Sequence, residues 1–420
     1  MQVGSSHSDV GRTPSSAADA PVGLPCMTDR GSIADKGVRP TSTTLRVLHV
    51  SSGNLYGGVE TALVALARFR HLCPAMQPEF ALSFEGRLSR ELAETGARVH
   101  QLGEVRTRKP WTIWSARANL RALLAEQPFD VVLCHMAWPM AMFGSTARKA
   151  GKPLAFWAHD AANGSHWLER WASRVSPDIV IGNSEFTKGT LPLLFPNAPC
   201  KIVFYPVKPT EPPDARSCRA EIRRALGVSD DTVAIIQVSR MEAWKGHHLH
   251  LDALAKLKDN PRWMCWMVGG AQRPEELKYM REIQEKAVRL GIGDRVRFLG
   301  QRSDVPSLLA AADIFSQPNL GAEPFGIVFI EALAAGLPVV TTAMGGPKEI
   351  IDESCGIVAP PGDADQVAAA LRRLIDSGEL RSRLGRHGPE RARELCDPAG
   401  RIPDLYSALA GVAKNQVVKN

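Results

Sequence analysis

The order of short apolar runs along the chain limits its possible folds more than any other feature. From Thr44 onward, runs rich in β-branched residues alternate with stretches of helical character. Such alternation predicts parallel sheets whose strands are joined by right-handed crossovers. We therefore predict an α/β fold in which two Rossmann-like domains with parallel sheets face each other across a cleft. A first set of strands begins at 45–50 and ends near 202–205, and a second set is expected at 233–238, 263–268, 295–299, 312–316, 338–341 and 356–358.

The length of 420 residues also favours two domains, because one hydrophobic core seldom serves so long a chain. Segment 206–214 is rich in proline and is the predicted linker. Residues 45–205 then form an N-terminal domain and residues 215–400 a C-terminal domain, followed by a helix and tail at 401–420. Residues 1–44 are rich in Ser, Gly, Asp and Pro, so we expect a disordered leader or a misplaced start codon.

Composition narrows the class of protein and its compartment. Eight cysteines are scattered without Cys-x-x-Cys pairs or Cys/His clusters, which favours reduced thiols in the cytoplasm over disulfides or zinc. The chain carries no apolar run long enough for a secretory signal or a membrane span, and no cluster of carboxylates that indicates a metal site. The isoelectric point near 9.0 suggests nucleic acid as a partner, but the basic residues are dispersed and match no nucleic-acid-binding module.

Two carboxylates separated by seven residues indicate a nucleotide site in the second half. Glu323 falls in a loop after the predicted strand 312–316, and Glu331 falls on the helix predicted at 326–335. The unpaired amides near Phe325, Gly326 and Ile327 would bind a diphosphate at the positive end of that helix. Glu331 would accept hydrogen bonds from both hydroxyls of a ribose. The alternative is an ordinary surface helix with acidic residues.

Arg240 and Lys245 are the strongest cationic candidates for binding the diphosphate. Arg240 follows the predicted strand 233–238, and Lys245 precedes Gly246 at the expected start of the next helix. A planar guanidinium and a compact ammonium together would neutralise the charge that develops on a leaving diphosphate. The alternative is a solvated basic loop.

A second glycine turn lies in the first half, where Gly57 and Gly58 open the helix predicted at 59–70. Without Cβ atoms, this turn would let the backbone approach a phosphate or the transferred sugar. The spacing from Gly53 does not match the Gly-x-Gly-x-x-Gly fingerprint, so a hydride-transferring dehydrogenase is disfavoured. In the alternative interpretation, the two glycines only shape a tight turn.

Two histidines end predicted strands of the first half. His135 follows 131–134, and His159 follows 153–158 and precedes Asp160. Parallel strands ending on the same side would bring both rings to the cleft. A lone histidine is more often structural than functional. Asp160 would orient His159 or cap the segment that follows.

Five ordered motifs resemble those of one enzyme family, the retaining glycosyltransferases of family 4, which have the two-domain GT-B fold. The resemblance covers about residues 45–412 and implies that the N-terminal domain is the acceptor side and the C-terminal domain the donor side. Its motifs are Gly57-Gly58-Val59-Glu60, Ser239-Arg240-Met-Glu-Ala-Trp-Lys245-Gly246, the run from Glu323 to Glu331 with Gly-Leu-Pro-Val-Val after it, Met344-Gly345-Gly346-Pro347-Lys348-Glu349-Ile350, and Gly356-Ile-Val-Ala-Pro-Pro-Gly362-Asp363.

The resemblance implies roles for several of these residues. It places His159 in the active site near the donor sugar and its phosphate, and His135 at an acceptor or structural position together with Asp160. Glu323 would hold hydroxyls of the transferred sugar, while Arg240, Lys245 and the helix amides stabilise the departing diphosphate. It also implies retention of anomeric configuration, proton transfer to the leaving phosphate, metal independence, and a C-terminal helix around 402–413 that returns to the first domain.

The implied activity is hexosyl transfer from a nucleoside-diphosphate sugar to a glycan, glycolipid or lipid-linked acceptor, in cell-surface polysaccharide or lipopolysaccharide biosynthesis. UDP is the first expected carrier, followed by GDP and ADP. A sugar-nucleotide epimerase of the same architecture and a non-catalytic sugar-nucleotide-binding protein remain as alternatives.

A basic stretch at 106–121, which includes Trp111 and Trp114, indicates peripheral contact with an anionic membrane or a lipid-linked acceptor, at the inner face of the cell membrane. The alternative there is a solvated helix face whose tryptophans belong to the core.

Overall fold

The fold contains two parallel sheets, each buried by helices. The structure is a computed structural model that describes residues 44–54, 57–208, 215–271 and 273–417. The predicted leader, except Thr44, lies outside the described residues, as do 209–214 of the predicted linker and the end of the predicted tail. The prediction of two Rossmann-like domains is confirmed.

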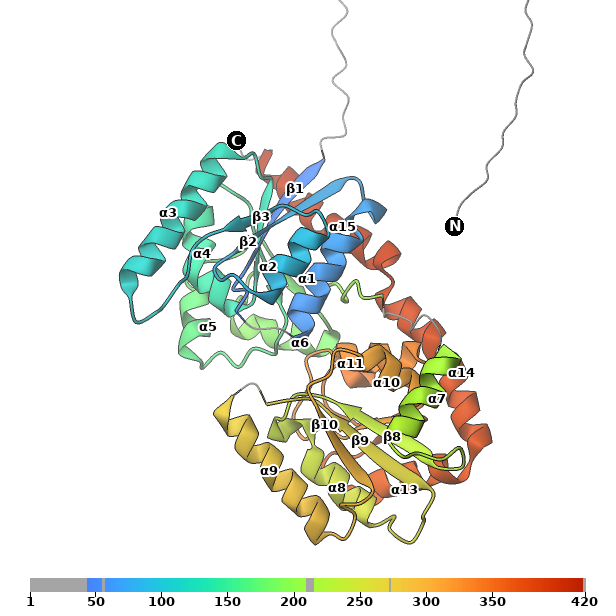
Figure 1. Cartoon of the computed structure of the whole chain (residues 1–420). Coiled ribbons are helices and arrows are strands. Elements are labelled where there is room, and N and C mark those ends of the chain that lie inside the picture. The colour runs from blue at the N-terminus through green and yellow to red at the C-terminus, as the bar shows by residue number, and fades with distance from the viewer. Residues whose placement is uncertain (1–43, 55–56, 209–214, 272, 418–420) are drawn as a thin grey trace, which may run out of the picture. The chain divides into compact units, whose positions relative to one another are not determined.

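The first sheet has seven strands in the order β3-β2-β1-β4-β5-β6-β7, and every pair is parallel. Strands β1, β2 and β3 of this sheet are labelled in Figure 1. Apart from Arg46, every residue of β1 is buried, and so is all of β4, as expected for strands covered on both faces. Its strands are β1 (Leu45–Ser51), β2 (Met76–Leu82), β3 (Val99–Gln101), β4 (Val131–His135), β5 (Leu154–Ala158), β6 (Ile179–Gly182) and β7 (Cys200–Ile202). The accompanying helices are α1 (Gly58–Arg68), η1 (Arg70–Leu72), α2 (Arg87–Glu94), α3 (Pro110–Glu126), α4 (Ala137–Lys149), α5 (Trp167–Ala172), α6 (Glu185–Thr190) and η2 (Leu191–Leu193).

The second sheet has six parallel strands in the order β10-β9-β8-β11-β12-β13. Its strands are β8 (Val233–Val238), β9 (Trp263–Val268), β10 (Val296–Gly300), β11 (Ile314–Gln317), β12 (Val339–Thr342) and β13 (Gly356–Ala359). The helices of this half are α7 (Ala215–Ala225), η3 (Ala243–Lys245), α8 (His247–Ala255), α9 (Pro274–Arg289), α10 (Val305–Ala311), α11 (Ile327–Ala334), α12 (Pro347–Ile350), α13 (Ala364–Asp376), α14 (Gly378–Cys396) and α15 (Pro398–Val417).

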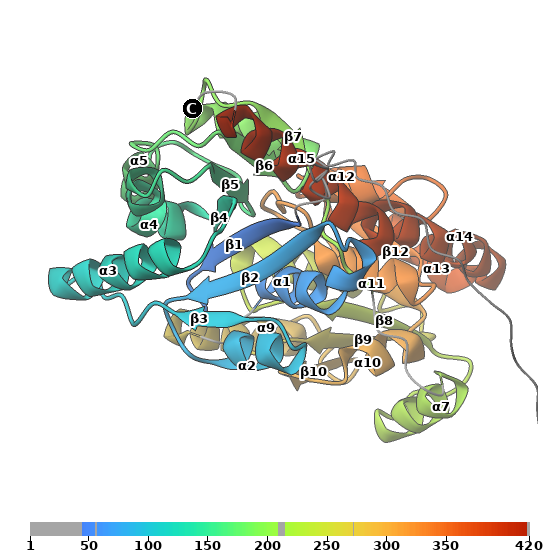
Figure 2. The same cartoon turned by 90° about the horizontal axis from the view of Figure 1, so that it is seen from above.

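Helices cover both faces of the first sheet (Figure 2). One apolar cluster lies between this sheet and α3 and α4. A larger cluster lies on the opposite face, against α1 and α2, and continues into the second sheet with α10 and α11. The larger cluster also includes Ile402, Leu405 and Leu409 of α15, which contacts η1, α1, β4 and β6. The last helix of the chain therefore packs on the first sheet.

Strand boundaries differ from the sequence prediction by at most three residues. The strand expected at 312–316 begins only at Ile314, because the amide of Ala312 still bonds to the carbonyl oxygens of Leu308 and Leu309 in the last turn of α10. The C-terminal helix begins at Pro398, earlier than expected, since proline is well tolerated in the first turn of a helix.

Candidate active site

A cavity of about 830 Å³ is lined by the carboxyl ends of strands from both sheets and by the loops that follow them. This is where ligands bind in open α/β sheets. The lining includes eleven of the twelve predicted site residues: Gly57, Gly58, His135, His159, Asp160, Arg240, Lys245, Glu323, Phe325, Gly326 and Ile327. The twelfth, Glu331, does not line it.

The loop before α11 is held in place by a second motif of the same half. Glu323 forms a parallel bridge with Gly345, and the Gly346 amide donates a 2.7 Å hydrogen bond to the Glu323 carbonyl oxygen. Gly345 has a φ of +72°, and a Cβ there would overlap that carbonyl group. Only glycine therefore allows these two segments to approach so closely.

Lys245 and Glu323 form an ion pair inside the cavity. Each side chain is only 11% exposed, and the Lys245 ammonium also lies 3.9 Å from the centre of the Trp244 ring. Arg240 pairs with Glu242 at 2.9 Å and is more exposed. Lys245, predicted to bind the diphosphate, and Glu323, predicted to bind the sugar, are thus paired with each other in this structure.

The glycine turn of the first half faces the loop before α11. A Cβ at Gly58 would lie 3.3 Å from the Cδ1 atom of Ile327. The Gly57 amide donates a 2.9 Å hydrogen bond to the carboxylate of Glu60, a buried residue that also lines the cavity. Burial raises the pKa of Glu60, although its hydrogen bonds and nearby Arg240 oppose the shift.

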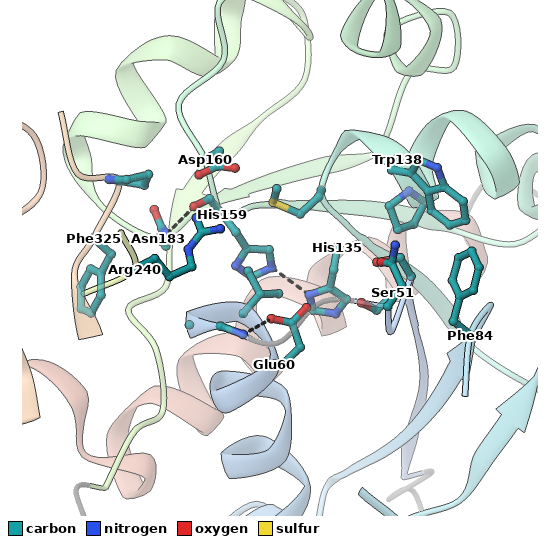
Figure 3. Close-up of a pocket in the computed structure, with 18 of the residues that line it drawn as sticks. Ser51, Glu60, Phe84, His135, Trp138, His159, Asp160, Asn183, Arg240 and Phe325 are labelled. Carbon is teal, nitrogen blue, oxygen red and sulfur yellow. Dashed lines mark hydrogen bonds between the residues drawn. The ribbon is translucent and has the colours of Figure 1, made fainter. Parts of the chain in front are cut away.

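Three buried histidines form a hydrogen-bonded chain across the ends of β1, β4 and β5 (Figure 3). His49 Nδ1 lies 2.9 Å from His135 Nε2, and His135 Nδ1 lies 2.9 Å from His159 Nε2. Burial lowers the pKa of His49 and His159 to about 3 and that of His135 well below its usual value. All three rings are therefore neutral near pH 7.

Tyr205 and Asn183 favour one direction for the hydrogen bonds of this histidine chain. Asn183 Nδ2 donates to the Tyr205 hydroxyl at 2.8 Å, and that hydroxyl can donate its own proton to His159 Nδ1, 2.7 Å away. In this arrangement His159 carries its proton on Nε2 and donates to His135, which donates from Nε2 to His49. His49 Nε2 is left without a hydrogen-bond partner among the described residues.

Both ring nitrogens of His159 are thus engaged by His135 and Tyr205. Asp160 is not the residue that orients the ring, which corrects the alternative in which it does. Desolvation at the cavity wall raises the pKa of Asp160, and the charge of Glu323 raises it further.

Glu331 lies one turn beyond Ile327 on α11 and is partly buried. Burial raises its pKa to about 7. Within the part of the chain that the structure describes, its carboxylate has no hydrogen-bond or ion-pair partner. A buried carboxylate without a protein partner is suited to a ligand that supplies hydroxyl donors.

Several lining residues carried no sequence signal that we used: Ser51, Phe84, Trp138 and Asn183. Trp244 also lines the cavity and lies within the quoted motif that contains Arg240 and Lys245. The sequence places Tyr205 at the end of a strand, but β7 ends at Ile202 and the tyrosine lies beyond it. Glu60 belongs to the quoted Gly-Gly-Val-Glu motif, and this position could have identified it as a site residue. Trp111 and Trp114 are 61% and 68% exposed, so the alternative that they belong to the core is wrong.

Among the described residues, no group of three or more His, Cys, Asp or Glu side chains could hold a metal ion. No helix in this part of the chain is long and apolar enough to cross a membrane.

Comparison with known proteins identifies relatives of both halves. The chain is 32% identical over 169 residues to the lipopolysaccharide core biosynthesis glycosyltransferase LpsE of Rhizobium meliloti, covering 40% of this chain and 47% of the relative. It is 34% identical over 188 residues to the lipopolysaccharide glucosyltransferase WaaG of Escherichia coli, covering 44% and 46%. The matches span about half the length of these curated relatives.

Solved structures share the fold over most of the chain. The structure of Anabaena Alr3699/HepE in complex with UDP matches with a TM-score of 0.76 and 23% identity, covering 87% of this chain and 100% of the other. Residues 58–187 match the glycosyl transferase 4-like domain, and residues 219–391 match the glycosyl transferases of group 1. With matches in both halves, the chain belongs to the group 1 glycosyltransferases of GT-B fold.

Proposed function

We propose that this protein transfers a hexosyl unit from a nucleoside-diphosphate sugar to a glycan, glycolipid or lipid-linked acceptor with retention of configuration, in lipopolysaccharide or cell-surface polysaccharide biosynthesis. The observation that carries the proposal is the convergence of Arg240, Lys245 and Glu323 with the α11 N-terminus in one cavity. These groups provide two cations and free amides for a diphosphate, and a carboxylate for sugar hydroxyls.

In the proposed reaction, the diphosphate takes Lys245 away from Glu323, which then accepts hydrogen bonds from the transferred sugar. Arg240, Lys245 and the amides of Gly326 and Ile327 stabilise the negative charge that grows as the glycosidic bond breaks. The acceptor hydroxyl attacks from the face that the phosphate leaves, and a phosphate oxygen takes its proton. No enzyme carboxylate forms a covalent bond, and the reaction needs no metal.

We propose UDP as the carrier, with GDP and ADP as the next candidates. The support is that Anabaena Alr3699/HepE, which shares the fold, has been solved with UDP and with UDP-glucose. Glu331, whose carboxylate has no partner among the described residues, would bind the ribose.

A thermal-shift panel of UDP, GDP, ADP and CDP tests the donor site, because ligand binding raises the melting temperature by mass action. We expect one nucleotide to raise it and Lys245→Ala to weaken that shift. Lys258→Ala, an exposed lysine outside the cavity, is the matched control and should leave it unchanged. If folded protein responds to none of the four nucleotides, the donor-site assignment is wrong.

Turnover is tested separately, since an epimerase or a binding protein would also respond to the nucleotide. Release of UDP from UDP-glucose that depends on added acceptor extract supports transfer. Nucleotide binding without acceptor-dependent release supports one of the two alternatives.

We also propose that the enzyme works in the cytoplasm and contacts the anionic inner face of the cell membrane through α3. Trp111 and Trp114 are exposed on this helix, and Arg108 and Lys109 precede it. Exposed tryptophans beside cations are suited to an anionic interface. Co-sedimentation with phosphatidylglycerol vesicles should fall in the double variant Trp111→Ala/Trp114→Ala but not in Trp167→Ala, which removes another exposed tryptophan. Unchanged binding would refute this surface.

A further inference from the structure

The cavity has two chemically different ends. Arg240 and Phe325 lie at one end, and Phe84 and Trp138 lie together at the other, with His135 between them (Figure 3). The aromatic end is formed by loops after β1 and β2, by segment 105–109 and by the start of α4. All of these segments lie in the N-terminal domain, which is the expected acceptor side. We therefore take the aromatic end as the place for an acceptor.

The acidic side chains of the cavity lie away from its aromatic end. Asp160 lies on the side of Arg240, and Glu60 lies beside His135, between the two ends (Figure 3). Glu323 is paired with Lys245. Among the described residues, no carboxylate lines the aromatic end, where segment 105–109 contributes Arg106, Arg108 and Lys109. This excess of positive charge is complementary to an anionic acceptor rather than to a neutral one.

The three cations of this segment differ in their partners. Arg106 pairs with Glu104 at 2.8 Å. Neither Arg108 nor Lys109 has a carboxylate partner in the described part of the chain, and the Lys109 ammonium lies 6.0 Å from the centre of the Trp111 ring. Both lie on the cavity wall rather than only on the outer surface.

Apolar and aromatic side chains also line this end. The rings of Phe84 and Trp138 lie 6.2 Å apart between centres, with Met136 and Pro139 beside them. An aromatic surface of this kind suits the C–H face of a pyranose ring, while the ring's polar substituents reach the cations.

We propose that the sugar that receives the hexosyl unit carries an anionic group, a phosphate or a carboxylate, which Arg108 and Lys109 bind while Trp138 supports the ring. The inference rests on the proposed function, because it names the acceptor class of that same site. Arg108 can hold such an oxyanion through two parallel N–H donors, and Lys109 adds a point charge.

The test is a binding measurement on UDP-saturated protein with three matched sugars: glucose, glucose 6-phosphate and glucuronic acid. Saturation-transfer NMR titration reports weak dissociation constants for each. We expect the anionic sugars to bind about tenfold more tightly than glucose, as for two partly exposed charge-assisted contacts. Tighter binding of only one of them would identify the anion as phosphate or as carboxylate.

The double variant Arg108→Ala/Lys109→Ala should remove this preference and leave the affinities for glucose and UDP unchanged. The matched control Lys149→Ala/Arg174→Ala removes two exposed cations of the same domain outside the cavity and should retain the preference. Equal or undetectable binding of the three sugars, or a preference that survives in the first double variant, would overturn the inference. UDP binding without an anion preference refutes only this inference, whereas loss of UDP binding refutes the donor site.

Discussion

Replacing Glu331 with glutamine should stabilise the empty protein at alkaline pH and weaken nucleotide binding. The carboxyl has an ordinary pKa of 4.5 and a folded-state pKa of about 7 because of burial. The folded protein therefore holds a proton that the unfolded chain has released between these two values. Stability falls as pH rises through this window, and the full penalty is present above it.

The shift corresponds to about 3 kcal/mol of the free energy of unfolding above pH 7, which is an upper limit because Glu331 is partly exposed. At pH 5 the same penalty is less than about 1 kcal/mol. Glutamine has a similar shape and does not ionise, so the variant should melt several degrees above the wild type at pH 8. The two proteins should differ little at pH 5.

The same variant should bind UDP more weakly. Losing the charge that accepts two ribose hydroxyls should remove about 2 kcal/mol of binding, roughly 30-fold in affinity. Melting curves at pH 5 and pH 8, with and without UDP, measure both effects. Glu390→Gln, an exposed glutamate outside the cavity, should change neither. An equal melting difference at the two pH values, or unchanged UDP affinity, would refute this account of Glu331.

Three other substitutions test the site and its supports. Tyr205→Phe leaves Asn183 Nδ2 and His159 Nδ1 without their shared hydroxyl, so urea unfolding should show a loss of about 2 kcal/mol, against almost none for Tyr406→Phe; equal losses would contradict the network. Gly345→Ala should destabilise by more than about 1 kcal/mol and lower UDP affinity, whereas Gly411→Ala, a helical glycine with open space around it, should be neutral or stabilising. In a double-mutant cycle of Lys245→Met and Glu323→Gln, the double variant should be more stable than the sum of the single changes predicts, by about 1–3 kcal/mol, and strict additivity would show that the pair is not coupled.

Much of the fold and of the cavity followed from local sequence signals. Arg240 comes two residues after the end of β8, and His159 comes directly after β5, so their places at the carboxyl edge of a parallel sheet could be read from the strand pattern. Gly345 is different: the sequence analysis identified it only as part of a motif, and its close approach to Glu323 is seen in the structure. Positions at strand ends can be predicted because neighbouring residues in the sequence define where each strand stops.

The histidine chain could not be predicted in the same way. His49 lies within β1, two residues before its end, and reaches His135 only because β1 and β4 pair with His49 opposite Leu133. Tyr205 joins from beyond β7. These contacts depend on the register of strands far apart in the sequence. A buried histidine inside a strand would normally be assigned to the core, and no pattern around it indicates otherwise.

The pairing of Lys245 with Glu323 changes how the site should be understood. Sequence reasoning gave each residue a separate ligand group, but in this structure the two nearly buried charges compensate each other. If either charge lacked its partner, burying it at this position would carry a large desolvation penalty. Binding of a nucleotide sugar is then an exchange of partners, in which Lys245 passes to the diphosphate and Glu323 to the sugar hydroxyls. A nucleotide that lacks its sugar offers a partner to Lys245 alone, so the pair favours the complete donor over the product that remains after transfer.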